Sequence, residues 1–125
     1  MPTTTGAAQA VAEVIPEMKG KLDGMAMRVP VPDGSIVQLV VNLKKETSAE
    51  VINNIFKSVS KNEMKGILEY SEEPLVSSQI VGNAHSSIFD SELTKVMGKL
   101  VEVTSWYDNE WGYSCRMVDV LKMLV

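Results

Sequence analysis

The sequence is poor in the residues that build metal sites and disulfides. It contains one cysteine, Cys115, and one histidine, His85, in 125 residues. A single thiol cannot form an internal disulfide, and one Cys with one His cannot supply the Cys and His ligand set of a zinc site. We therefore expect neither an oxidised secreted scaffold nor a zinc enzyme, and we predict no metal site.

Long apolar runs and basic clusters are also missing. No stretch reaches the 18 consecutive apolar residues of a membrane-spanning helix, and residues 1–5 lack the basic and apolar segments of a signal peptide. The 12 Lys and Arg residues are outnumbered by 16 Asp and Glu residues, giving a net charge of −4, and the only adjacent basic pair is Lys44–Lys45. We expect a cytoplasmic protein with neither a nucleic acid nor a membrane as its partner.

What the sequence does contain is the composition of an ordinary globular chain. Hydrophobic residues make up 45% and charged residues 22% of it. Both fractions are typical of a soluble protein that can bury a core, and the length fits one domain. We therefore predict one domain over residues 1–125.

Hydrophobic spacing predicts three helices. Small and apolar residues at 7–15, after a hydroxyl cap, indicate a short helix that Pro16 ends. A capping box at Thr47–Glu50 precedes helical spacing over residues 48–61. After Asp108 and Asn109, a last helix places Met117, Val120, Leu121 and Leu124 on one face.

Between the helices, β-branched and apolar runs predict strands. Residues 25–31 and 35–43 flank a Pro-Asp-Gly turn and should pair as a hairpin. Further strands are expected at 66–71, 75–80, 87–89 and 100–107. This order of elements favours an α+β fold, with a mostly antiparallel sheet and helices packed on one face.

Two features near the N-terminus could bind anions. Thr5 and Gly6 stand at a helix start, where free N–H groups and the helix dipole attract negative charge, although ordinary capping is the commoner role. Arg28, on a predicted strand, has the planar fork that holds phosphate or carboxylate, and the alternative is a partly buried ion pair.

Near the C-terminus the residues alone leave the chemistry open. Asn109 could simply cap a helix, and the aromatic side chains around it, Tyr113 among them, fit a core or an interface better than a cofactor stack. Cys115 and His85 fall in different elements, and a lone cysteine early in a helix is more often packing than catalysis.

Five collinear motifs resemble the glyceraldehyde-3-phosphate dehydrogenase family. They are T-T-G-A-A (residues 4–8), G-M-A-M-R-V-P (24–30), M-K-G-I-L (64–68), H-S-S with F-D (85–90) and S-W-Y-D-N-E-W-G-Y-S (105–114). The resemblance covers essentially the whole chain and implies the C-terminal part of the catalytic domain. The family's Gly-rich Rossmann domain and its S-C-T-T-N-C nucleophile segment are absent from these residues.

The resemblance assigns expected roles to five residues. Thr5 and Gly6 match the pocket for inorganic phosphate, and Arg28 matches the arginine that contacts the substrate phosphate. Asn109 and Tyr113 match residues beside the nicotinamide ring. Cys115 stands where many relatives carry Asn, so the resemblance implies no catalytic residue in this chain.

The implied activity is that of a phosphorylating, NAD- or NADP-dependent aldehyde dehydrogenase of glycolysis. It would act on a small phosphorylated aldehyde with inorganic phosphate, as a homo-oligomer. The 125 residues alone are expected to bind no cofactor and to be inactive. The alternatives are a paralogue acting on erythrose 4-phosphate, a fragment of an aspartate-semialdehyde-type enzyme, and a non-catalytic binding or oligomerisation fragment; the S-W-Y-D-N-E motif argues against the second of these.

Overall fold

The chain forms two compact units, Met1–Val31 and Pro32–Val125, each of which packs within itself. The computed structural model describes residues 1–125. None of its helices is long and apolar enough to cross a membrane.

The first unit is a small ribbon with a helix. Strand β1 (Pro2–Thr3) pairs antiparallel with β2 (Ala26–Met27). Helix α1 (Ala7–Val14) lies between them in the chain and confirms the helix predicted there. Pro16 ends α1 and opens a short 3-10 helix, η1 (Pro16–Met18), because proline cannot donate the next helical hydrogen bond but fits a helix start.

The predicted hairpin between residues 25–31 and 35–43 is wrong. In the structure β2 pairs with β1, whereas β3 (Ser35–Asn42) pairs along its whole length with β6 (Leu100–Tyr107). Prolines at 30 and 32 lack the N–H that a ladder needs, so the strand cannot continue into the turn. The turn residues instead mark the boundary between the two units.

The second unit is built on a four-stranded sheet with the order β3-β6-β5-β4. β6 pairs antiparallel with β3 and with β5 (Ser87–Met97), and β4 (Leu68–Ser71) lies parallel to β5. The α+β class and the mostly antiparallel sheet are therefore confirmed. β5 is longer than the predicted strand at 87–89, and its register with β6 shifts between Asp90 and Lys95.

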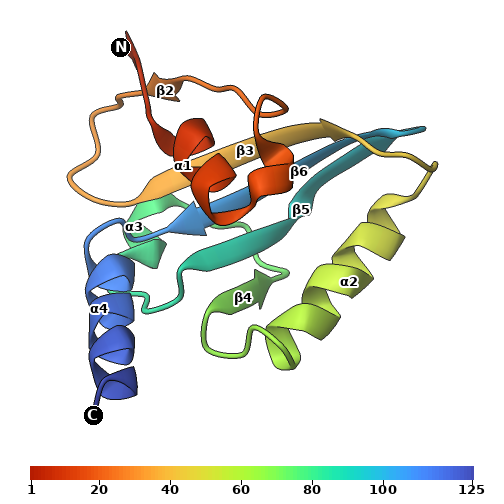
Figure 1. Cartoon of the computed structure of the whole chain (residues 1–125). Helices are drawn as coiled ribbons and strands as arrows, with labels where there is room; N and C mark the ends of the chain where they lie inside the picture. Colours follow the sequence, from red (N-terminus) through yellow and green to blue (C-terminus); the bar gives the residue numbers. More distant parts are fainter. The chain divides into compact units, whose positions relative to one another are not determined.

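Helix α2 (Ala49–Lys61) covers β4 and β5 and closes the core (Figure 1). The ring of Phe56 stacks on that of the buried Phe89, with centroids 3.9 Å apart. The helix begins one residue later than the capping box predicts, because Ser48 is the cap. Its hydroxyl accepts a hydrogen bond from the Val51 N–H at 3.3 Å.

One further element differs from expectation, and the last helix matches it. Residues 75–80, predicted as a strand, contain the short helix α3 (Ser77–Ile80), and the Gln79 side chain accepts a hydrogen bond from the Val76 N–H at 2.9 Å. This local bond stabilises a helical turn where the apolar residues alone favour a strand. Helix α4 (Trp111–Met123) confirms the last predicted helix and extends beyond the end of the sheet (Figure 1). Its apolar residues Met117, Val120 and Leu121 are exposed.

Candidate functional site

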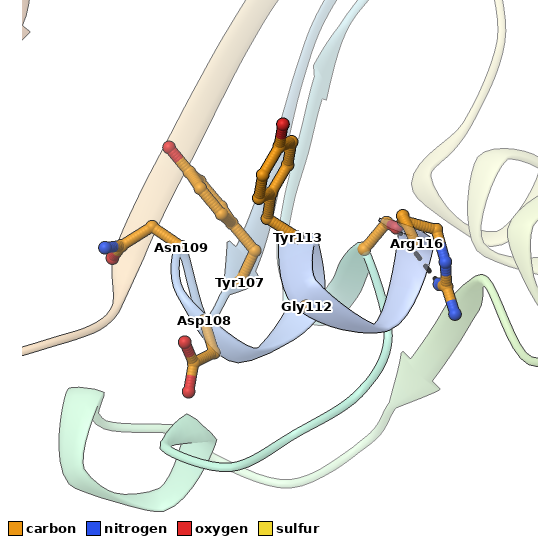
Figure 2. Close-up of a pocket in the computed structure, with 7 residues that line it drawn as sticks. Tyr107, Asp108, Asn109, Gly112, Tyr113 and Arg116 are labelled. Carbon is orange, nitrogen blue, oxygen red and sulfur yellow. Dashed lines mark hydrogen bonds between the residues drawn. The ribbon is translucent and has the colours of Figure 1, made fainter. Parts of the chain in front are cut away.

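An open pocket of about 290 Å³ lies where β6 ends and α4 begins. The structure brings two of the predicted site residues, Asn109 and Tyr113, to this one pocket. Figure 2 shows the rings of Tyr107 and Tyr113 together on one side of the chain, while Asp108 points to the other side. The complete lining is Ser86, Tyr107, Asp108, Asn109, Gly112, Tyr113 and Arg116.

The Asn109 side chain joins the end of β6 to the start of β3. Its Oδ1 accepts hydrogen bonds from the Gly34 N–H at 3.2 Å and from the Ser35 hydroxyl at 3.1 Å. Because a backbone N–H can only donate, the atom facing Gly34 must be the amide oxygen. The amide NH₂ of Asn109 has no partner within the chain, so its donors are available to a ligand. The helix itself begins after Glu110, so Asn109 is not its cap residue.

Asp108 is the buried anchor of the pocket, with 2% of its surface exposed. Its Oδ1 accepts from the N–H groups of Glu110 at 2.9 Å and Trp111 at 2.7 Å, and its Oδ2 accepts from the Gly82 N–H at 2.8 Å. Burial by itself raises the pKa of this carboxyl, but the N–H donors of Gly82, Trp111 and Glu110 outweigh it and lower the pKa below its usual value. Asp108 is therefore a fixed anion that ties the loop at Gly82 to the start of α4.

Close packing at Gly112 brings α4 against the same loop. A Cβ at this position would lie 3.1 Å from the His85 carbonyl oxygen, so any other residue would require the loop or the helix to shift slightly. Tyr113 follows directly and is exposed, with its ring at the pocket. The glycine thus allows the helix that carries Tyr113 to approach the loop that supplies Ser86 to the pocket lining.

Arg116 is a lining residue that was not predicted from the sequence. Its guanidinium pairs with Asp119, with Nη2 2.6 Å and Nε 2.9 Å from Oδ2. Its Nη1 donates to the Ser86 hydroxyl at 3.1 Å. The available signal was that the chain has only two arginines and that this one stands one turn after Tyr113.

In the first unit, Thr5 and Gly6 form the start of α1. The Thr5 hydroxyl accepts from the Ala7 N–H at 3.2 Å, and Gly6 is the residue before the first helical one. A hydroxyl and N–H groups of a first helical turn therefore stand together, which is the arrangement that attracts anions. Gly6 occupies the N-cap position and has no side chain, so the side-chain acceptor at this helix start is the Thr5 hydroxyl.

Arg28 follows β2, and its backbone N–H donates to the Met1 carbonyl at 2.9 Å. This bond continues the β1–β2 ladder, so Arg28 stands at one end of the ribbon and Thr5 comes after the other. The side chain is exposed and forms no ion pair. The alternative of a partly buried ion pair is therefore not what the structure shows.

The remaining candidates lie outside these sites. His85 Nδ1 lies 2.9 Å from both Glu69 Oε2 and Asn83 Oδ1, so this ring nitrogen already has polar partners within the chain. Cys115 is a free, partly exposed thiol on α4. No group of three or more His, Cys, Asp or Glu side chains in the structure could hold a metal ion.

Comparison with known proteins gives one family. Residues 1–109 match the family model described as glyceraldehyde 3-phosphate dehydrogenase, C-terminal domain. The chain is 55% identical over 124 residues to a glyceraldehyde-3-phosphate dehydrogenase of Mycobacterium avium, covering 99% of the chain and 37% of that protein. It is 54% identical over 123 residues to glyceraldehyde-3-phosphate dehydrogenase 2 of Bacillus subtilis, covering 98% of the chain and 36% of the relative. The chain thus spans little more than a third of the length of these relatives.

Proposed function

Because the chain belongs to the family of glyceraldehyde 3-phosphate dehydrogenase C-terminal domains, we propose that it supplies ligand-binding groups to a phosphorylating glyceraldehyde-3-phosphate dehydrogenase of glycolysis. The observation that carries this is the pocket that brings Asn109 and Tyr113 together at the start of α4. We also propose a cytoplasmic location and assembly as a homo-oligomer.

The pocket fits the nicotinamide of NAD or NADP. Its tyrosine rings offer a flat apolar surface, and the Asn109 amide is fixed by Gly34 and Ser35 with its NH₂ donors unused. Those donors would bind the carbonyl oxygen of the carboxamide and set which face of the ring meets the substrate. The cofactor, when bound, accepts the hydride released as the aldehyde is oxidised.

The first unit would hold phosphate. The N–H groups and hydroxyl at Thr5 and Gly6 would bind inorganic phosphate. A phosphate oxygen would then bond to the acyl carbon as the thioester bond to the family's nucleophilic cysteine breaks, giving an acyl phosphate and releasing the thiolate. The unpaired guanidinium of Arg28 would bind the phosphate that the aldehyde already carries, since arginine forms paired hydrogen bonds with phosphate oxygens. The choice between glyceraldehyde 3-phosphate and erythrose 4-phosphate would depend on the length of the substrate's carbon chain between its aldehyde and its phosphate.

A chimera tests this function. We expect the purified 125 residues to show no NAD-dependent oxidation of glyceraldehyde 3-phosphate, because they contain no nucleophile that the family motif would assign. The same residues, replacing the matching part of the Mycobacterium avium enzyme, should restore turnover that requires inorganic phosphate. Turnover by the isolated chain that is abolished by Cys115→Ser, or a folded chimera that binds no cofactor, would contradict the proposal.

A further inference from the structure

The guanidinium of Arg116 is almost completely used within the chain. Nε and Nη2 donate to Asp119, and Nη1 donates to the Ser86 hydroxyl at 3.1 Å and lies 3.5 Å from the Gly66 carbonyl oxygen. Four of the five N–H groups of an arginine are thereby directed at protein atoms. Although Arg116 lines the pocket, it has little left to offer a ligand.

What these bonds do is hold the loop of residues 82–86 against α4. The loop is fixed at its other end by Asp108, which accepts from the Gly82 N–H, and in the middle by Gly112 packing on the His85 carbonyl. Arg116, in the second turn of α4, contributes the third attachment, at Ser86. Ser86 also donates its N–H to the Ile67 carbonyl at 2.9 Å, so the attachment reaches β4.

We propose that Arg116 is a positioning residue: by clamping Ser86 and the loop of residues 82–86 onto α4, it fixes the part of the pocket wall that Ser86 forms. The attachment of the loop is inferred from the hydrogen bonds of Arg116 to Ser86 and Asp119. Its effect on cofactor binding rests on the proposed function. Lysine cannot replace Arg116, because one ammonium group cannot bind Asp119 and Ser86 with the same fork geometry.

Hydrogen exchange of the 125-residue chain tests the clamp without any cofactor. Arg116→Ala, Arg116→Lys and Ser86→Ala should each speed amide exchange over residues 82–86 by about 10-fold, as expected when a hydrogen bond to a charged group is lost. In the double variant Arg116→Ala with Ser86→Ala, the effect on amide exchange should be far smaller than the sum of the two single effects. The reason is that each substitution removes the same Arg116–Ser86 hydrogen bond. Lys122→Ala, which removes another partner of Asp119 on the same helix, is the matched control.

Exchange in Arg116→Lys and Ser86→Ala that equals exchange in Lys122→Ala would overturn the clamp. In the chimera, Arg116→Lys should raise the KM for the cofactor about 10-fold and leave the KM for the phosphorylated aldehyde unchanged. An equal rise of both would show general destabilisation and overturn positioning. If the unmodified chimera has no turnover, the proposed function fails, and the exchange data still decide whether Arg116 clamps the loop.

Discussion

Asp108 shows how one side chain organises the pocket. Its three N–H donors are those of Gly82, Glu110 and Trp111, so a single carboxylate joins the loop at Gly82 to the start of α4, although Gly82 lies 26 residues before Asp108. A neutral amide at this position would leave at least one of these N–H groups without a charged acceptor. Loss of this kind is among the more costly single changes in a small domain.

We predict that Asp108→Asn lowers the free energy of unfolding by about 1.5–3 kcal/mol at pH 7, as measured by urea unfolding. Asp23→Asn is the matched control, because that exposed carboxylate accepts only from the neighbouring Gly24 N–H, at 2.8 Å. A change no larger than that of the control would show that the three bonds to Asp108 contribute little.

The same carboxylate predicts a pH dependence. Its pKa is lower in the folded chain than the value of about 3.9 in an unfolded one. The stability that it contributes is therefore present above about pH 4 and is lost as the pH falls through the folded pKa. Acid unfolding curves should show the stability gap between wild type and Asp108→Asn closing below about pH 4; a gap that widens there would contradict the sign.

At the residue scale, only some of the residues that line the pocket could be predicted from the sequence. Asn109 and Tyr113 are four positions apart at a strand–helix junction, so local spacing alone could place them together. Arg116 was missed because its partners Ser86 and Gly66 lie 30 and 50 residues away in the chain. No local pattern records a contact of that range.

At the scale of elements, helices followed their predictions better than strand pairing did. The helix at 49–61 depends on apolar spacing and a nearby cap, both of which are local. The partner of β3 is β6, which begins 58 residues after β3 ends, whereas the predicted partner was its neighbour in the chain. A turn motif can indicate a change of direction without a hairpin when prolines prevent one strand from pairing.

The cap of α2 gives a test at this scale. Ser48→Ala should lower the free energy of unfolding by about 1 kcal/mol, because the Val51 N–H loses its acceptor. Ser58→Ala, at an exposed site of the same helix, should be neutral or slightly stabilising. Equal effects of the two substitutions in thermal unfolding would show that the helix begins elsewhere.

At the scale of the whole molecule, strand β3 leaves apolar side chains exposed at an edge of the sheet. This edge strand leaves Ile36, Val37, Leu39 and Val40 between 39% and 54% exposed, on both of its faces. Contiguous apolar surface on an edge strand favours pairing with another chain. We propose that this strand contributes to the subunit contacts of the proposed homo-oligomer.

We predict that the purified chain associates in a concentration-dependent way in light scattering. Val37→Lys should reduce association, because a charge on an edge strand opposes pairing. Val76→Lys adds the same charge at an exposed valine in the loop before α3 and is the control. A concentration-independent 13.7 kDa species with cooperative unfolding would contradict this expectation.

The central claim, that the first unit binds phosphate and the start of α4 orients nicotinamide, is tested most directly by steady-state kinetics of two variants of the chimera. Arg28→Leu should raise the KM for the phosphorylated aldehyde about 10–100-fold and leave the KM for the cofactor unchanged. Asn109→Asp keeps the oxygen that accepts from Gly34 and Ser35 but removes the NH₂ donors, so it should raise the KM for the cofactor alone. If Arg28→Leu leaves the aldehyde unaffected, or if both variants raise both constants alike, the division of roles is wrong.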